Sequence, residues 1–235
     1  MDYTYICAYD RTPIGGFQGS LSKVPATKLG SHTIKAVIGK SAIDIKHIDE
    51  VIMGNVLSAN LGQAPARQAA LGAGLSNNVE CMTINKVCGS GLKSAMLADQ
   101  SIRMNNSNVV IAGGMENMSL APYYSSQSRT GMIFGHNKMI DSIIHDGLWD
   151  PYNNFLMGNC GEVLCNENNY TRQNQDDYAI ESYRKSNDAI SNGLFKHEIS
   201  GVEIKNKKGS DVIITDEEPL KFRKEKISTL KPAFD

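Results

Sequence analysis

The fold is decided by residues 81–114, which read CMTINKVCGSGLKSAMLADQSIRMNNSNVVIAGG. Residues 81–87 are rich in strand-forming side chains and predict a β-strand. A helix is expected to follow the turn at Cys88, and the residues expected to face a core are Leu92, Ala95, Met96 and Ile102. Residues 109–112 form an apolar run that is typical of a buried parallel strand. Strand, helix and strand in this order predict an α/β fold with parallel pairing.

The sequence on either side continues this alternation of strands and helices. Residues 119–150 are the exception: they lack clear periodicity, and a loop of this length is usually functional or an inserted subdomain. Towards the carboxyl end, Thr171 is expected to cap a helix that stops at Gly193. The remaining expected elements are strands at residues 5–9 and 51–57, helices beginning at Pro25 and spanning residues 63–71, and a hairpin of residues 198–205 and 212–215.

Composition argues against several classes of protein. The chain has 235 residues, 41% of them hydrophobic and 21% charged, which is ordinary for a soluble globular protein. A net charge of -1 provides no field that would recruit nucleic acid or an anionic membrane. No apolar run approaches the roughly 20 residues of a membrane span, and the amino terminus lacks the layout of a signal peptide. The expected location is the cytoplasm.

Cys88 has a different context from the other cysteines. The chain has five cysteines and no CxxC spacing, so neither a structural zinc nor another metal site is expected. Cys88 stands between a predicted strand and a predicted helix, and Gly89 and Gly91 let the backbone turn sharply there. The four others, which are interpreted as packing residues, are Cys7, Cys81, Cys160 and Cys165.

The position of Cys88 suits acyl transfer onto sulfur. A helix amino terminus offers unpaired N–H groups and a partial positive charge, and both favour a thiolate. The same N–H groups can stabilise the oxyanion that forms when a thioester is attacked. Residue types and their order therefore predict Cys88 as a nucleophile.

Two segments resemble hallmarks of the thiolase family. Residues 83–93, TINKVCGSGLK, resemble its active-site segment, in which Asn stands three residues before a Cys in Cys-x-Ser-Gly-Leu. Residues 112–119, AGGMENMS, resemble its second hallmark. Three further segments match the family in order along the chain: residues 11–15, Met157-Gly158 with Glu162, and residues 231–235. The five matches span essentially the whole chain.

The resemblance implies a thiolase-like layered α/β fold, a mixed sheet covered by helices. Residues 1–118 and about 151–235 would form the amino-terminal thiolase domain, incomplete at its carboxyl end, and residues 119–150 an inserted loop region. The carboxyl-terminal domain of complete thiolases is expected to be absent, because no Asn-Glu-Ala-Phe or Gly-His-Pro motif occurs in these residues. The chain alone is therefore not expected to turn over.

The implied activity is the Claisen condensation of two acetyl-CoA molecules to acetoacetyl-CoA and CoA, and the reverse thiolysis. The resemblance places the acyl group on Cys88, with CoA thioesters as substrates and no cofactor. By position, the residues expected to line the pantetheine tunnel are Phe134, Leu148, Met157 and Phe234. Resemblance of residues 119–150 to the loop region of tetrameric members implies a homo-oligomer, a tetramer or a dimer.

Two departures from the family keep more than one function open. Leu156 stands where biosynthetic thiolases commonly have His, which keeps a degradative 3-ketoacyl-CoA thiolase of broader chain length as an alternative. Leu220 and Lys221 stand where members often have an Arg near the CoA adenine, and Lys stacks on a flat base less well. Two further hypotheses are a condensing enzyme that acts on carrier-protein thioesters and a non-catalytic, truncated thiolase-like protein.

Overall fold

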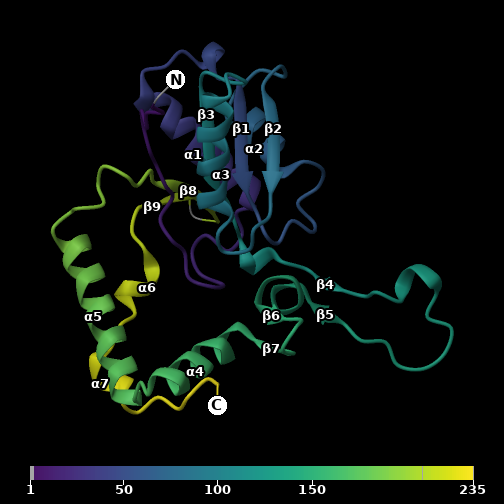
Figure 1. Ribbon diagram of the computed structural model, residues 1–235, viewed down its shortest axis with the longest axis vertical. Coiled ribbons are helices and arrows are strands. Elements are labelled where there is room, and N and C mark those ends of the chain that lie inside the picture. Colours follow the sequence, from purple (N-terminus) through teal and green to yellow (C-terminus); the bar gives the residue numbers. More distant parts are fainter. Residues whose placement is uncertain (1–2, 208, 235) are drawn as a thin grey trace.

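A three-stranded parallel sheet forms the centre of the molecule (Figure 1). The computed structural model describes residues 3–207 and 209–234. Strand β1 (Glu50–Gly54) lies in the middle, between β2 (Glu80–Ile84) and β3 (Val110–Gly114). Glu50 lies opposite Glu80 on one side and Val110 on the other, so all three strands end at the same edge. The expected α/β class with parallel strands is confirmed.

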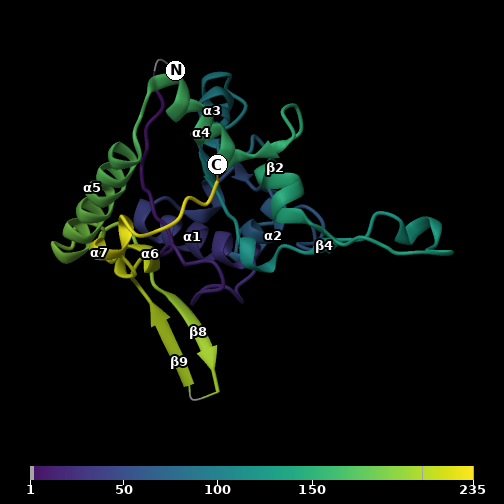
Figure 2. The ribbon, with the colours of Figure 1, turned by 90° about the horizontal axis from the view of Figure 1, so that it is seen from below.

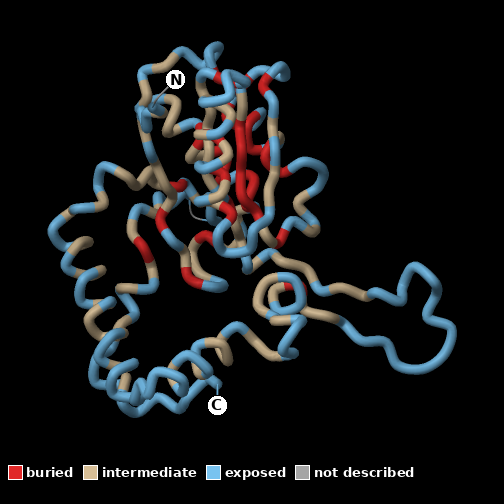
Figure 3. The backbone as a smooth tube through the Cα atoms, in the orientation of Figure 1, coloured by how far each residue is buried: buried red, intermediate tan, exposed pale blue. Residues whose placement is uncertain are grey.

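Helices cover both faces of this sheet. Helix α3 (Ser90–Arg103) packs on one face, and α1 (Ala26–Ser41) and α2 (Pro65–Gly72) lie on the other (Figures 1 and 2). Burial is concentrated along β1, as Figure 3 shows, because this strand is flanked on both edges and covered on both faces. The most deeply buried residues therefore lie along β1 and directly precede the edge at which the three strands end.

The rest of the chain lies outside the layered core. A short ladder of β4 (Tyr123–Tyr124) and β5 (Ile140–Asp141) carries a loop that reaches away from the sheet (Figure 1). The elements in and around this region are η2 (Met118–Leu120), η3 (Ser128–Thr130), the π-helical η4 (Ile143–Leu148), β6 (Trp149–Asp150) and β7 (Phe155–Leu156), whereas η1 (Ile45–His47) lies between α1 and β1. The carboxyl part consists of α4 (Met157–Asn168), α5 (Arg172–Ser191), β8 (Val202–Asn206), β9 (Gly209–Ile213), α6 (Glu217–Leu220) and α7 (Lys224–Ile227).

Local signals placed several elements correctly. Pro25 precedes α1 directly. Thr171 caps α5 through a capping box, in which its side chain accepts from the Asn174 N–H and the Asn174 side chain accepts from the Thr171 N–H. The expected hairpin is β8 and β9, which pair in antiparallel register; Lys208 in its turn lies outside the described residues. These features depend on neighbours in sequence, which is why the sequence predicts them.

Three expectations about packing are wrong. Residues 5–9 form no strand, although they run extended beside the sheet. Leu92 is 73% exposed, and Met96 is also exposed, because α3 turns its small residues to the sheet instead. Those buried residues follow one another at a spacing of four: Ser90, Ser94 and Ala98. Strand β3, expected to be buried, is only half-buried because it lies at an edge of the described sheet.

Candidate functional site

Cys88 lies exposed in the turn between β2 and α3, at the edge where all three parallel strands end. Strand β2 stops at Ile84, three residues earlier than expected, so that residues 85–89 are free to form the turn. Val87 adopts a left-handed conformation with φ 47°, which is strained for a β-branched residue. The backbone immediately before the thiol is therefore held in a conformation that the surrounding contacts must impose.

Ser90 imposes that conformation. Its buried hydroxyl accepts a hydrogen bond from the Lys86 N–H at 2.8 Å and donates one to the Val87 carbonyl at 2.6 Å. The Asn85 side chain accepts a hydrogen bond from the Val87 N–H at 2.9 Å, which is a further contact that holds the same turn. Asn85 and Ser90 thus fix the backbone of Lys86 and Val87, directly before Cys88.

Two glycines let the start of α3 lie directly on the sheet. A Cβ added to Gly54, the last residue of β1, would lie 2.7 Å from the Ser90 carbonyl carbon and 2.9 Å from the Gly91 nitrogen. A Cβ added to Gly114, the last residue of β3, would meet the Gly91 Cα at 3.4 Å. Ser94 then ties the helix to β3 through a 2.7 Å hydrogen bond to the Gly113 carbonyl. This packing places the amino end of α3, and with it Cys88, above the ends of the strands.

Unpaired backbone donors lie in the turn at Cys88 and in the first turn of α3. Within the described residues, the backbone N–H groups of Cys88, Gly91 and Leu92 have no hydrogen-bond acceptor. They are the donors that the start of a helix leaves free, and they carry the positive end of its dipole. Burial raises the pKa of the Cys81 thiol on neighbouring β2, which disfavours its thiolate. Of these two thiols, only Cys88 combines exposure with nearby donors that can hold an oxyanion.

Glu116 supports the adjacent strand end, a role that the sequence alone did not reveal. Its carboxylate accepts from the Val56 N–H at 2.8 Å and from the Asn55 side chain at 2.9 Å. Asn55 is buried and also donates to the Met115 carbonyl at 3.0 Å. The loop after β1 is therefore fixed to the loop after β3, beside the turn that carries Cys88.

Glu116→Gln is expected to destabilise the chain by about 2 kcal/mol, because a neutral amide accepts these hydrogen bonds less strongly and presents one oxygen instead of two. Urea unfolding followed by circular dichroism measures the change. Glu80→Gln is the matched control: Glu80 is exposed on β2, and its replacement is expected to change the stability by no more than about 0.5 kcal/mol. Equal effects of the two substitutions would contradict the role of Glu116.

Asn117, the next residue of the same segment, fastens a second loop. Its side-chain amide donates to the carbonyls of Leu21, Ser22 and Val24, the last at 2.7 Å, and its oxygen accepts from the Ser119 N–H at 3.0 Å. Adjacent residues of the quoted second hallmark therefore hold two different loops at the same edge of the sheet.

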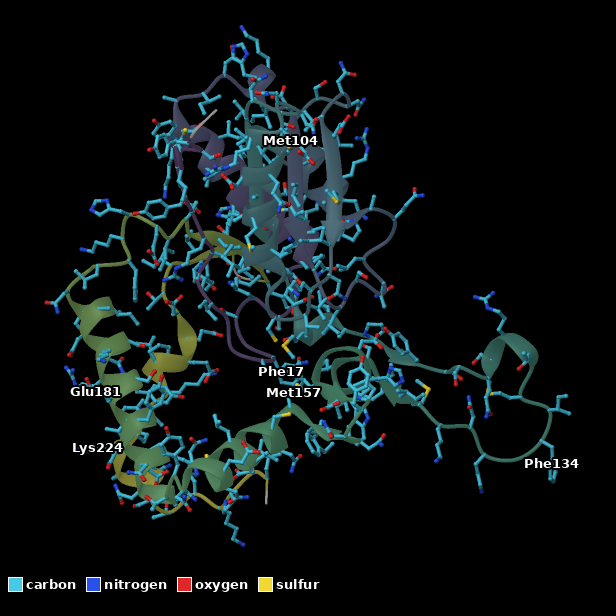
Figure 4. The ribbon with its side chains drawn as sticks, viewed as in Figure 1. Phe17, Met104, Phe134, Met157, Glu181 and Lys224 are labelled. Atoms are coloured by element: carbon cyan, nitrogen blue, oxygen red, sulfur yellow. The ribbon has the colours of Figure 1, made fainter. Side chains whose placement is uncertain are left out.

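The residues expected to line a tunnel lie in different surroundings. Phe134 is fully exposed near the tip of the extended loop, away from the sheet (Figure 4). Leu148 is half-buried at the end of η4. Met157 begins α4, and the Phe234 ring packs against its neighbour Gly158, where an added Cβ would clash with the ring. The structure thus places Phe234 against the residue that follows Met157 and leaves Phe134 apart; the role of these residues in binding stays a prediction.

Neither a metal site nor a membrane-spanning helix is found in the part of the chain that the structure describes. Residues 3–207 and 209–234 contain no group of three or more His, Cys, Asp or Glu side chains arranged to hold a metal ion. In the same residues, no helix has both the length and the apolar character to cross a bilayer.

Comparison with known proteins finds relatives along the whole chain. The family model for the amino-terminal domain of thiolases matches residues 4–235. An acetyl-CoA acetyltransferase of Yarrowia lipolytica is 50% identical over 235 residues, which are 100% of this chain and 58% of that protein. One of Pseudomonas aeruginosa is 46% identical over 236 residues, 100% of this chain and 60% of that protein.

A solved structure shares the fold as well. The crystal structure of a thiolase from Ascaris suum in complex with coenzyme A superposes with a TM-score of 0.91 at 37% identity, and the match covers 98% of this chain and 58% of that one. The chain therefore spans about three fifths of the length of the relatives that it matches.

Proposed function

The chain belongs to the thiolase family, and on that premise we propose that Cys88 accepts an acetyl group from acetyl-CoA as the first step of a condensation that yields acetoacetyl-CoA. The observation that carries the proposal is the exposed thiol of Cys88 at the amino end of α3, beside free backbone N–H groups.

The first half-reaction follows from this arrangement. The Cys88 thiolate attacks the carbonyl carbon of the thioester, and the carbonyl oxygen becomes an oxyanion near the free N–H groups. The oxyanion then collapses, the bond between carbon and the CoA sulfur breaks, and CoA leaves while the acetyl group stays on Cys88. The hydrogen bonds of Ser90 and Asn85 hold the strained turn at Val87, so the sulfur is kept in place before the substrate arrives.

The second half-reaction is proposed for a complete protein of this family. A base removes the α-proton of a second acetyl-CoA, and the carbanion attacks the acyl-cysteine to form acetoacetyl-CoA and release the thiolate. Thiolysis is the reverse. CoA thioesters and free CoA are the only reactants that the two directions need, so no cofactor is invoked. Cytoplasmic location and a homo-oligomer, a dimer or a tetramer, are part of the same proposal.

Transfer of label from radiolabelled acetyl-CoA tests the first half-reaction. The chain is incubated with the thioester and quenched in acid, and the label is located by mass spectrometry. We expect label on Cys88 in the unaltered chain and none after Cys88→Ala. Cys7→Ala is the matched control, since Cys7 is also exposed but lies outside the helix-start setting, and it is expected to keep the label.

Absence of label from a chain that circular dichroism shows to be folded would contradict the proposal that this part alone forms the acylation site. Label on Cys7 in place of Cys88 would contradict it too. The hypothesis of a non-catalytic protein predicts the first of these outcomes.

Leu156 supports testing a broader substrate range. It lies half-buried in β7, directly before Met157. Biosynthetic thiolases commonly have His at this position, so Leu156 is the observation that keeps a degradative thiolase as a second candidate. Comparing acetyl-CoA with hexanoyl-CoA in the same labelling assay distinguishes the two: faster acylation by hexanoyl-CoA would favour the degradative enzyme.

A further inference from the structure

The π-helical element η4 lies against the loops at the edge where the parallel strands end (Figure 1, between β5 and β6). A Cβ on its residue Gly147 would lie 3.6 Å from the Leu57 side chain, so η4 runs directly beside that side chain. Leu57 is buried in the loop after β1, and the Asn55 N–H of the same loop donates to the Ile84 carbonyl at 3.0 Å. Ile84 ends β2, and the turn that carries Cys88 begins at the next residue. These contacts connect η4 to the backbone that carries the thiol.

The conformation of η4 needs support from outside the element. A π-helix is rare and occurs frequently at functional sites. Six residues are too few for a helix to be stable alone. The start of η4 is fixed, because the Ile143 N–H donates to the Asp141 carboxylate at 2.9 Å, and the N–H of the buried Ser142 donates to the Pro122 carbonyl at 3.3 Å. The second half, which meets Leu57, needs a contact of its own.

Tyr124 supplies the contact for the second half. Its hydroxyl donates a hydrogen bond to Oδ2 of Asp146, across 22 residues of sequence. Tyr124 lies in β4 and pairs with Ile140 of β5, so its backbone is held by the ladder from which η4 departs. Asp146 directly precedes Gly147, the residue that lies beside Leu57. The hydrogen bond therefore anchors η4 at the point where it meets the edge of the sheet.

Both partners are in the protonation states that this hydrogen bond requires. The hydrogen bond from Tyr124 is the chief cause that lowers the pKa of Asp146, and the contact of His145 Nδ1 with the carboxylate at 2.8 Å lowers it further. The Asp146 carboxylate in turn raises the pKa of Tyr124. At neutral pH the carboxylate is therefore ionised and the phenol keeps its proton. A hydrogen bond to an ionised acceptor is stronger than one between neutral groups.

We propose that Tyr124 is a positioning residue for the CoA thioester, because its hydroxyl holds η4 as one wall of the approach to Cys88. The thiol is exposed at the edge where the strands end, so the substrate has to arrive over this edge. A wall that is already in place costs no ordering when the thioester binds. Tyr124 and Asp146 do not react with the substrate; they act through the placement of η4. This inference rests on the proposed acylation of Cys88 and adds to it the residues that guide the substrate.

Protection of Cys88 by CoA measures the placement of this wall. Iodoacetamide alkylates the thiol, mass spectrometry follows the rate, and CoA is added at increasing concentration to slow the reaction. Tyr124→Phe removes only the hydroxyl and is expected to raise the CoA concentration that halves the rate by about tenfold. Without CoA the rate is expected to stay the same, because the turn at Cys88 is unaltered and the small reagent needs no wall.

Tyr123→Phe is the matched control. Tyr123 is the neighbouring residue of β4, is 59% exposed and points to the opposite face of the ladder, so its replacement is expected to leave the protection unchanged. Asp146→Ala is expected to weaken the protection as much as Tyr124→Phe does. The double substitution is expected to weaken it no further, because each change removes the same hydrogen bond. Asp146→Asn keeps an acceptor oxygen and is expected to retain most of the protection.

Four results would overturn the proposal. They are an unaltered chain that CoA does not protect, equal protection in the unaltered chain and Tyr124→Phe, a loss as large in Tyr123→Phe, and a changed alkylation rate in Tyr124→Phe without CoA. Acetyl labelling separates these results from a failure of the proposed function. A chain that CoA protects through Tyr124 but that acetyl-CoA does not label would contradict the acylation and leave the positioning of CoA in place. A labelled chain in which Tyr124→Phe behaves as the unaltered chain would contradict the positioning alone.

Discussion

Gly54→Ala is expected to destabilise the chain by about 3 kcal/mol or more. The new methyl group would lie 2.7 Å from the Ser90 carbonyl carbon and 2.9 Å from the Gly91 nitrogen, and backbone at the start of a helix cannot move aside as a flexible side chain can. Because β1 is the most deeply buried strand, the strain must shift α3 and with it Cys88. Urea unfolding measures the loss of stability, and the acetyl-labelling assay measures the effect on the thiol.

Gly39→Ala is the matched control for this substitution. Gly39 lies in α1, and an added Cβ there would have nothing within 4 Å. Alanine is expected to stabilise the chain at this position by up to about 1 kcal/mol, because it favours a helix more than glycine does. If Gly54→Ala left the urea midpoint unchanged, the close packing of α3 on β1 would be contradicted.

Arg11→Ala is expected to cost about 3 kcal/mol. The Arg11 guanidinium binds both oxygens of Asp216, at 2.8 Å and 3.0 Å, and its Nε donates to Glu198 at 2.6 Å. Asp216 is buried and also accepts from the Ile14 N–H at 2.8 Å. Removal of the arginine leaves a buried carboxylate without its counter-charge, and it removes the side-chain contacts of Arg11 with the carboxyl part of the chain.

Arg184→Ala is the control that separates this effect from the general effect of losing an arginine. Arg184 also binds two carboxylates, those of Glu181 and Asp188, but all three side chains are exposed on α5. Solvent screens such pairs, so the expected change is no more than about 1 kcal/mol. A loss for Arg11→Ala as small as this would show that the contact with Asp216 contributes little.

The contribution of the Arg11–Asp216 pair is expected to depend on pH. Burial alone would raise the pKa of Asp216, but hydrogen bonds from Arg11 and Ile14 and the charge of Arg11 outweigh it and lower the pKa. A native pKa below the unfolded value of about 3.9 adds stability above that pH, and this stability is lost as the pH falls through the native pKa. The difference in unfolding free energy between the unaltered chain and Arg11→Ala should therefore shrink below about pH 4. A constant difference from about pH 7 to about pH 3 would contradict the assignment.

The sequence alone predicted features that depend on neighbouring residues. Pro25 before α1, the helix cap at Thr171 and the turn that carries Cys88 all follow from residue types a few positions apart. Their signals are local because a cap or a turn satisfies its own hydrogen bonds within a few residues. The candidate nucleophile could be found for the same reason.

Only the tertiary structure decided which surfaces meet. The sequence of α3 offers two faces that could be buried, one that contains Leu92 and one that consists of small residues. The contacts of Ser90 with Gly54 and of Ser94 with Gly113 bury the small residues and leave Leu92 exposed. Residues 5–9 have the composition of a strand and form none, because a strand needs a partner edge, and the described chain supplies none for this segment. Helix faces and strand pairing depend on residues far apart in the sequence, so local patterns do not determine them.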